Sequence, residues 1–394
     1  MSQPLHIRGA KVWDGEQSVE RDLFIKHGRI VESKPNGALE VDLEGYTLFP
    51  GMVNAHDHLE LNHYPRTKFR EVYDNAHQWG EDVNAQLDSE PFRTLRRYPL
   101  KDRLFIGGLK NLLCGATTVA HHGPKYREMY ARDFPVRVLK NYGWAHSLHF
   151  DTDEEIVRSY KNTPKHHPWF IHLAEGTDEV AAGEYQRLKA LGCVGTNTVI
   201  VHGVGLDVDL LWTDYQRGQK FGGIVICPST NDYLLGTTLN VGSLNISPDD
   251  LPTAVGTDSR LTAKGDTYHE FRALSVMTGI NLSERVWSGF LECARNIVNR
   301  ADIGHLVTGA LADFQTHITC KRHEKMLIIQ NGIPRIGDPE MMAKFSHVQT
   351  VACTLDGVEK RIHIDLARQI HRCTLKERGL VVDVLPTGKR FFFF

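Results

Sequence analysis

The sequence predicts an α/β protein in which a TIM-like (β/α)8 barrel carries a small composite β-sandwich domain formed by both ends of the chain. Three features indicate this arrangement. Short strand-like runs with turn signals between them fill the first 50 residues and return after about residue 305. Between these regions, short apolar runs alternate with helix-patterned stretches. Polar residues able to bind metal or move protons stand at the carboxyl ends of several apolar runs.

The terminal regions, 1–50 and 305–394, are expected to fold together as one β-rich domain. Near the N-terminus, the pair Asp14-Gly15 is a strong tight-turn signal between two short runs. The tail shows strand-like runs at 311–314 and 326–329 and a run with helical spacing at 362–372. No long linker or internal repeat separates these parts.

The region 51–304 is expected to form the barrel. Its clearest strand-like runs are 115–120, 143–150, 168–173, 198–202, 223–227 and 254–258. Helix-patterned segments such as 178–191 and 207–217 lie between them. The competing fold is an open doubly wound sheet, but no GxGxxG fingerprint follows the first strand, which weakens that alternative.

Composition narrows the function classes. The 394 residues contain 46 Lys plus Arg against 48 Asp plus Glu, so a net charge of −2 argues against a nucleic-acid-binding or polybasic membrane-binding protein. The seven cysteines include no CxxC pair, which favours reduced thiols over a disulfide framework. The N-terminus lacks the apolar core of a signal peptide, and no run approaches a membrane span. We therefore expect a cytoplasmic protein.

The stretch 49–58, FPGMVNAHDH, carries two histidines one residue apart. In a strand, residues i and i+2 point to the same face, so His56 and His58 can aim both imidazoles at one point. His172 and Asp258 stand at the ends of other predicted strands, and strand ends meet on one face of a barrel. Imidazole and carboxylate ligands with no thiolate near them suit zinc or iron(II). We expect one divalent metal ion per chain, zinc first and Fe(II) as the alternative, whose bound water becomes a hydroxide nucleophile.

Hydrolysis also needs groups that move protons. Glu175 follows His172 by three residues and can carry a proton from water to a leaving nitrogen, although a glutamate favoured by a helix N-terminus is the alternative. His202 can polarise the electrophile, or it is a hydrogen-bonded core histidine. Asp258 can accept a proton from the nucleophile as well as bind metal, or it caps a helix.

Six motifs in order, together with the tail GHLVTGALADF (304–314), resemble the amidohydrolase superfamily, in the branch of mononuclear aminohydrolases and chlorohydrolases that includes cytosine-deaminase-like and guanine-deaminase-like enzymes. These motifs are FPGMVNAHDH (49–58), GATTV (115–119), HLAE (172–175), VIVHG (199–203), ICPSTN (226–231) and GTDS (256–259). The resemblance covers essentially the whole chain. The resemblance implies that the metal ligands are His56, His58, His172 and Asp258. It also implies Glu175 as the proton shuttle and His202 as a catalytic histidine on the substrate side.

Some positions depart from the pattern of that branch. Asp57 stands between the paired histidines where relatives more often carry a neutral residue, and alternation should turn it to the opposite face. The branch often has a histidine before the Cys-Pro pair, but none precedes Cys227-Pro228 here. It usually has a run of small residues after the GTDS motif, whereas Arg260 stands there in this sequence. Lys140 precedes its strand, so it does not match a carbamylated lysine that bridges two metals.

Substrate contacts are expected from loops at the same face of the barrel. The candidates are Asn62, Arg66, Trp79, His122, Asn231 and Arg260. Arginines there could pair with an anionic group, and Trp79 could stack on a planar ring, although a solvated loop explains the same residues.

The residues and the resemblance together predict a hydrolase acting on carbon–nitrogen bonds other than peptide bonds. The expected reaction is hydrolytic deamination of a small nitrogen heterocycle or amidine-like compound by a metal-bound hydroxide. The alternatives are hydrolysis of a cyclic amide or dechlorination at the same site and, from another class, an inactive ligand-binding relative. The expected partner is a small molecule, with no nucleic acid and no membrane, and a homodimer is an open possibility. Substrate identity, leaving group, native metal and the role of the four terminal phenylalanines (391–394) are open at this point.

Overall fold

The computed structural model describes residues 3–240, 251–281, 283–316 and 321–385. The chain divides into two compact units. The larger unit comprises Asp14–Gln17 and Met52–His305, and the smaller comprises Met1–Trp13, Ser18–Gly51 and Leu306–Phe394. Cys320 and the four terminal phenylalanines lie outside the described residues.

The larger unit is built on parallel strands in two sheets. The three-stranded sheet has the order β10-β9-β8, with bounds Arg137–Val138, Ala116–His121 and Met52–Asp57. The five-stranded sheet runs in chain order through β11 (Gly143–Ser147), β12 (Trp169–Leu173), β13 (Thr198–His202), β14 (Gly223–Ile226) and β15 (Thr253–Val255). Most of these strands are buried at every residue, as expected of parallel strands covered on both faces.

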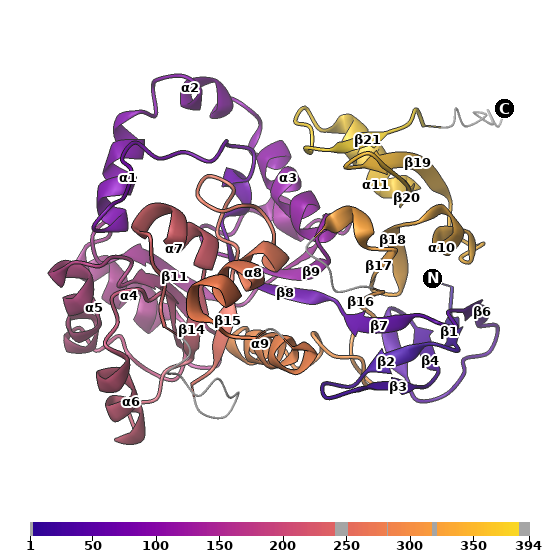
Figure 1. Cartoon of the computed structure of the whole chain (residues 1–394), viewed down its shortest axis with the longest axis horizontal. Helices are drawn as coiled ribbons and strands as arrows, with labels where there is room; N and C mark the ends of the chain where they lie inside the picture. Colours follow the sequence, from indigo (N-terminus) through magenta and orange to yellow (C-terminus); the bar gives the residue numbers. More distant parts are fainter. Residues whose placement is uncertain (1–2, 241–250, 282, 317–320, 386–394) are drawn as a thin grey trace. The chain divides into compact units, whose positions relative to one another are not determined.

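Helices connect the strands and lie outside them (Figure 1). They are η1 (Leu59–Leu61), α1 (Ala76–Ala85), α2 (Phe92–Leu95), α3 (Leu100–Leu113), η2 (Arg127–Tyr130), α4 (Asp153–Asn162), α5 (Glu179–Ala190), α6 (Val208–Gln216), α7 (Pro228–Leu235), α8 (Thr267–Thr278) and α9 (Glu284–Ile297). Several begin at a side chain that caps the first turn: Thr152 and Glu155 form a capping box on α4, and Asp178 caps α5. The predicted α/β class is confirmed.

The backbone also links the last strand to the first. The amides of Thr257 and Asp258, just past β15, donate to the His56 carbonyl of β8 at 2.9 and 3.1 Å. Among the described residues no ladder joins β10 to β11, so the pairing gives two parallel sheets, and a single closed barrel stays a prediction.

The smaller unit is β-rich. One sheet has the order β5-β4-β1-β6, with bounds Arg29–Val31, Leu23–Lys26, Leu5–Arg8 and Leu39–Asp42. The other has the order β21 (Leu380–Val382), β19 (Thr350–Leu355), β20 (Val358–His363), β18 (Ile333–Gly337), β17 (Leu327–Gln330), β16 (Phe314–Gln315), β7 (Thr47–Pro50), β2 (Lys11–Trp13) and β3 (Ser18–Glu20). Its helices are η4 (Arg322–Glu324), α10 (Pro339–Ala343) and α11 (Ile364–Arg372).

Both ends of the chain contribute to the smaller unit. Strand β7 from the N-terminal part pairs with β16 from the C-terminal part through Phe314 and Pro50. One buried cluster contains Leu5 and Leu48 together with Leu306 and Phe345. No helix in the described part of the chain is long and apolar enough to cross a bilayer.

Candidate metal centre

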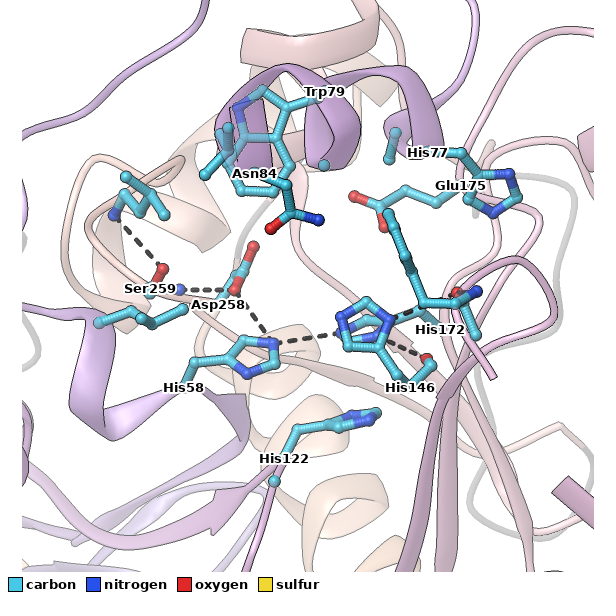
Figure 2. Close-up of a pocket in the computed structure, with 18 of the residues that line it drawn as sticks. His58, His77, Trp79, Asn84, His122, His146, His172, Glu175, Asp258 and Ser259 are labelled. Atoms are coloured by element: carbon cyan, nitrogen blue, oxygen red, sulfur yellow. Dashed lines mark hydrogen bonds and ion pairs between the residues drawn. The ribbon is translucent and has the colours of Figure 1, made fainter. Parts of the chain in front are cut away.

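The histidines and the aspartate predicted to bind metal converge at the strand ends of the larger unit. His56 lies in β8, His58 follows it, and His172 lies in β12. The Nε2 atoms of His58 and His172 are 3.2 Å apart, and His58 Nε2 is 3.7 Å from Oδ1 of Asp258. Figure 2 shows these three side chains turned towards one another. The structure therefore brings together residues that are up to 202 positions apart in the sequence.

His56 carries the clearest sign of a missing ligand. Its side chain is fully buried, and neither ring nitrogen has a hydrogen-bond partner. A buried polar atom without a partner costs free energy, so a ligand at this point would relieve it. Ligand atoms of His56, His58 and Asp258 all lie within 4.8 Å of one another. Zinc–nitrogen distances of about 2.0–2.1 Å in a tetrahedron place ligand atoms roughly 3.3 Å apart, so the donor set fits zinc.

Hydrogen bonds hold two of the ligands in the orientation that metal binding needs. His172 donates from Nδ1 to the carbonyl of His146 at 2.8 Å, which leaves the Nε2 lone pair free. Asp258 accepts from the Ser259 amide at 2.7 Å through Oδ1 and from the Thr262 hydroxyl at 2.8 Å through Oδ2. Asp258 does not cap the next helix, because Asp266 caps α8. The helix-cap alternative for Asp258 is wrong.

A glycine allows the last strand to reach the first ligand. A Cβ on Gly256 would lie 2.6 Å from the Cβ of His56 and 2.9 Å from its backbone nitrogen. Only a residue without a side chain fits this close approach. The glycine therefore brings the following Asp258 next to His56.

Asp57 lies on the face of β8 opposite the metal ligands, in a buried polar network. Its carboxylate accepts from the Asn62 and Asn111 amides, each at 2.7 Å, from the Lys110 ammonium at 3.0 Å, and from the Thr257 hydroxyl at 3.1 Å. Asp57 and Lys110 are both 0% exposed. This network ties β8 to α3 and to the residue before Asp258, so it holds in place the two segments that carry the candidate ligands.

Glu175 and His202 stand beside the ligands. Oε1 of Glu175 is 3.5 Å from Nδ1 of His202, which also lies 2.8 Å from Oδ1 of Asn231. Burial, reinforced by the charges of Asp258 and Glu184, raises the pKa of Glu175 well above its usual value. Helix α5 begins four residues later and is capped by Asp178, so the helix N-terminus alternative for Glu175 is wrong.

The backbone is strained at this face. Ala174, His202 and Asp258 have φ of 54°, 71° and 51°, in the left-handed region that side chains other than glycine rarely adopt. Such strain persists only where surrounding contacts enforce it, and it clusters at functional sites. Each of these residues either bears or adjoins a group of the proposed chemistry.

A cavity of about 580 Å³ opens above the ligands. His58, His172, Glu175, His202 and Asp258 line it. Buried His56 does not appear on its surface, because it lies beneath the other ligands.

Only some of the predicted substrate contacts reach this cavity. Trp79 and His122 line it. Asn62 instead binds Asp57, and its Oδ1 accepts from the Arg260 amide at 3.2 Å.

Three candidates remain, and two of them hold the protein itself. Arg66 donates to the carbonyls of Thr262 and Ser229 at 2.6 and 2.7 Å. Asn231 lies against His202. Neither of these side chains, nor that of Arg260, is among those that line the cavity.

Several lining residues are missed by the sequence reasoning. His146, His77, Asn84, Trp144 and Phe150 line the cavity. His146 stands within a predicted strand near its carboxyl end, so the strand-end rule could have found it. No sequence signal marks the others, since their position depends on how α1 and the β11 loop pack.

One expectation about the ligands needs correction. Cys227 does lie near the site, with its ligand atom within 4.8 Å of those of His56 and His202. Burial raises the pKa of the Cys227 thiol well above its usual value, and nearby carboxylates raise it further.

His122 also belongs to the histidine cluster. Ligand atoms of His56, His122 and His172 lie within 4.8 Å of one another. His122 donates from Nε2 to the carbonyl of Ala145 at 2.9 Å, and its buried Nδ1 has no partner. It lines the cavity directly below His172 and can meet a ligand there.

Solved structures show which class of fold this is. The chain shares the α/β fold of zinc-containing deaminases and triazine hydrolases. An adenosine deaminase from Xanthomonas campestris with bound zinc superposes with a TM-score of 0.67 at 16% identity, over 87% of this chain and 96% of that one. The resemblance to the aminohydrolase and chlorohydrolase branch is confirmed at the level of the fold.

Two further structures agree. An atrazine chlorohydrolase from Arthrobacter aurescens complexed with zinc gives a TM-score of 0.63 at 15% identity, over 87% of this chain and 99% of that one. An N-isopropylammelide isopropylaminohydrolase from Burkholderia multivorans gives 0.60 at 14% identity, over 84% and 98%. No protein-family model matches the sequence, and no curated protein matches it.

Proposed function

We propose that this chain is a metal-dependent hydrolase that deaminates a small nitrogen heterocycle or amidine-like compound. One divalent ion per chain, zinc first and Fe(II) as the alternative, would be held by His56, His58, His172 and Asp258. The observation that carries the proposal is His56, whose two buried ring nitrogens lack partners while three further donors converge beside it. The fold shared with an adenosine deaminase that binds zinc supports it.

The larger unit would be one catalytic domain, residues 51–304, with its eight parallel strands closed into a (β/α)8 barrel. The hydrogen bonds from Thr257 and Asp258 to His56 support closure between the last strand and the first. Residues 1–50 and 305–394 would form the composite β-sandwich domain, supported by their shared buried cluster. The six cysteines that the structure describes are buried and form no disulfide, which suits a reducing cytoplasm. A homodimer stays an expectation.

The bound ion supplies Lewis acidity that lowers the pKa of a water and makes it a nucleophile near neutral pH. The residues of the chain do the rest. Glu175 faces the same cavity and can take the proton from the attacking water, then give it to the leaving nitrogen. His202 lies 3.5 Å from Glu175 and can hydrogen-bond the atom that gains charge. Asp258 can accept the second proton of the water.

Hydrolysis of a ring amide or dechlorination at the same site is the second candidate. The shared fold with an atrazine chlorohydrolase favours keeping it. The leaving group decides between them, because an amine must be protonated as it leaves whereas chloride need not be. A proton carrier at Glu175 therefore favours a nitrogen leaving group over chloride, and the ammonia assay described below separates deamination from ring-amide hydrolysis. The inactive relative is not supported, because no expected ligand is missing.

Metal analysis tests the centre first. Purified protein should contain about one ion per chain, and His56→Ala should lose it. His371→Ala is the matched control, because His371 is exposed in the smaller unit and binds only the Asp383 carbonyl. Unchanged metal content in His56→Ala would refute the site.

Turnover tests the chemistry. A set of amino-substituted heterocycles should show ammonia release by the zinc-loaded protein. Glu175→Gln should keep its metal and lose about 10²–10⁴-fold in kcat, the usual contribution of a general acid–base group. A fully active Glu175→Gln would remove this residue from the mechanism.

A further inference from the structure

The end of the cavity away from the histidines is apolar. Its wall comes from the segment that follows β8, through η1, α1 and α2. The apolar side chains that line it are Leu61, Tyr64, Trp79, Val83, Leu87 and Phe92. Tyr64, Val83 and Phe92 form one buried cluster with Leu261, so the wall is backed by packed side chains. A group placed there would lose its contact with water.

Helix α1 presents this wall through regular spacing. Ala76, Gly80, Val83 and, just past the helix, Leu87 recur at intervals of three and four, which puts them on one face. The indole nitrogen of Trp79 donates to the Thr67 carbonyl at 3.0 Å, so the ring offers only its apolar surface. A ligand therefore needs few hydrogen-bonding groups to lie against this wall.

Asn84 is the polar exception on this helix. Figure 2 shows its amide directed from α1 towards the space above His58 and Asp258. Within the described residues, this amide hydrogen-bonds no protein group. It can offer a donor and an acceptor to a heterocycle held between the helix and the metal ligands.

The charges around the cavity are of one sign. None of the described residues that line it is Lys or Arg, whereas Glu60, Asp151 and Glu184 do line it. Two arginines of the loop after β8 are engaged elsewhere: Arg66 binds two carbonyls, and Arg70 forms an ion pair with Asp82 at 2.8 Å. At the apolar end, away from the proposed metal ion, an anionic substituent would meet no lining Lys or Arg, and carboxylates line the same cavity, so its binding would be disfavoured.

We infer that the substrate is an uncharged amino-substituted ring that bears an apolar substituent of several carbons and no anionic group. The ring would react at the histidine cluster, and the substituent would lie against Trp79, Val83 and Leu87. The cavity of about 580 Å³ falls within the range of roughly 300–1,000 Å³ that holds drug-sized ligands, which exceeds the need of a single small ring. The inference rests on the proposed function for the reaction but not for the binding.

Three compounds with one aminopyrimidine core test it: the unsubstituted ring, its butyl derivative and its 3-carboxypropyl derivative. Calorimetry on the zinc-loaded protein gives Kd, and ammonia release gives kcat/KM. The butyl compound should bind at least tenfold more tightly than the unsubstituted ring, since each buried methylene is worth about fourfold. The carboxypropyl compound should bind less tightly than the unsubstituted ring.

The two measurements separate the inference from the proposed function. Tighter binding of the butyl compound with no ammonia release from any of the three would sink the deamination and support the apolar subsite. Equal or tighter binding of the unsubstituted or carboxypropyl compound would overturn the subsite, whatever the turnover. Absence of binding by all three would overturn it as well.

A positive charge placed in the apolar wall should reverse the order in which the protein binds the butyl and carboxypropyl compounds. Leu87 is half-buried and lines the cavity, so Leu87→Arg should weaken the butyl compound at least tenfold and strengthen the carboxypropyl compound. Val72→Arg is the control, because Val72 is 56% exposed and lies outside the lining, and it should keep the wild-type order. Thermal unfolding checks that each variant folds, and Leu87→Lys, which also places a positive charge in the wall, serves in place of the arginine variant if that one does not. A folded Leu87 variant with the wild-type order would overturn the inference.

Discussion

Replacing Lys110 by methionine should destabilise the protein and weaken metal binding from behind the site. Lys110 lies in α3, is 0% exposed, and donates to Asp57 at 3.0 Å and to the Thr257 hydroxyl at 2.9 Å. Methionine has nearly the same length but no charge, so the variant leaves a buried carboxylate without its cation. Removing one partner of a buried ion pair typically costs about 3–5 kcal/mol.

The remaining contacts place the expected loss at the lower end of that range. Asp57 keeps the amide donors of Asn62 and Asn111 at 2.7 Å and the hydroxyl of Thr257 at 3.1 Å. Hydrogen bonds to a charged group contribute about 1.5–3 kcal/mol each, so these three compensate part of the charge. We expect the free energy of unfolding to fall by about 3 kcal/mol. Zinc affinity should fall about 10–100-fold, as it does when groups that orient metal ligands are lost.

Urea denaturation of the metal-free protein measures the first effect, and competition with a chelator measures the second. Lys101→Met in the same helix is the control, since Lys101 is exposed and should leave both values unchanged. The double variant Asp57→Asn with Lys110→Met should regain more than half of the lost stability, because the unpaired charge is gone. The reasoning is refuted if Lys110→Met stays within about 1 kcal/mol of wild type, or if the double variant is no more stable than the single one.

Three other outcomes are expected. Burial raises the pKa of Glu270 to about 8, against hydrogen bonds from Ser229 that lower it. Between about pH 4.5 and 8, the Glu270 carboxyl therefore keeps its proton in the folded state but loses it in the unfolded state. As the pH rises through this range, the stability that Glu270 contributes is lost, by at most about 1.4 kcal/mol per pH unit. Glu270→Gln should therefore make the free energy of unfolding depend less on pH between about pH 4.5 and 8. An unchanged slope would contradict the raised pKa of Glu270. Gly107→Ala should lower the free energy of unfolding by at least about 2 kcal/mol, because a Cβ there would lie 2.2 Å from the Leu59 carbonyl oxygen. Gly289→Ala is the control: a Cβ at Gly289 would meet nothing within 4 Å, so this variant should be neutral or stabilising in the same melting assay. Dialysis against a chelator should abolish ammonia release and added zinc should restore it, and activity that survives complete metal removal would exclude a metal mechanism.

The convergence of the candidate metal ligands could be predicted because each obeys a local rule. His56 and His58 share a face through strand alternation, and His172 is the penultimate residue of a strand, 169–173, that is buried at every residue. The strand-end rule then brings distant positions to one face without any knowledge of side-chain packing. The expected strand at 198–202 agrees with β13 at both ends, and the expected helix over 178–191 differs from α5 by one residue at each end.

The errors arise where long-range contacts decide. Arg66 looked like a substrate contact because it lies in the right loop, but its guanidinium binds the carbonyls of Ser229 and Thr262, more than 160 residues away in the sequence. Asn231 was likewise expected to contact substrate, but it lies in α7 and its side chain lies 2.8 Å from Nδ1 of His202. No local pattern distinguishes these cases.

The same contrast explains why the chemistry of the site is easier to predict than its specificity. A metal centre needs a few residue types at fixed points on the strands, and Asp57 behind them can be placed by alternation alone. The apolar wall instead depends on how α1 lies across the strand ends, which is set by contacts such as that between Gly80 and Phe150, where a Cβ would approach the ring to 2.7 Å. Substrate preference should therefore change with substitutions in α1 that leave metal content untouched. Metal content should change with substitutions behind β8 that never meet the substrate. Variants at Leu87 and Lys110 separate these two properties within one protein.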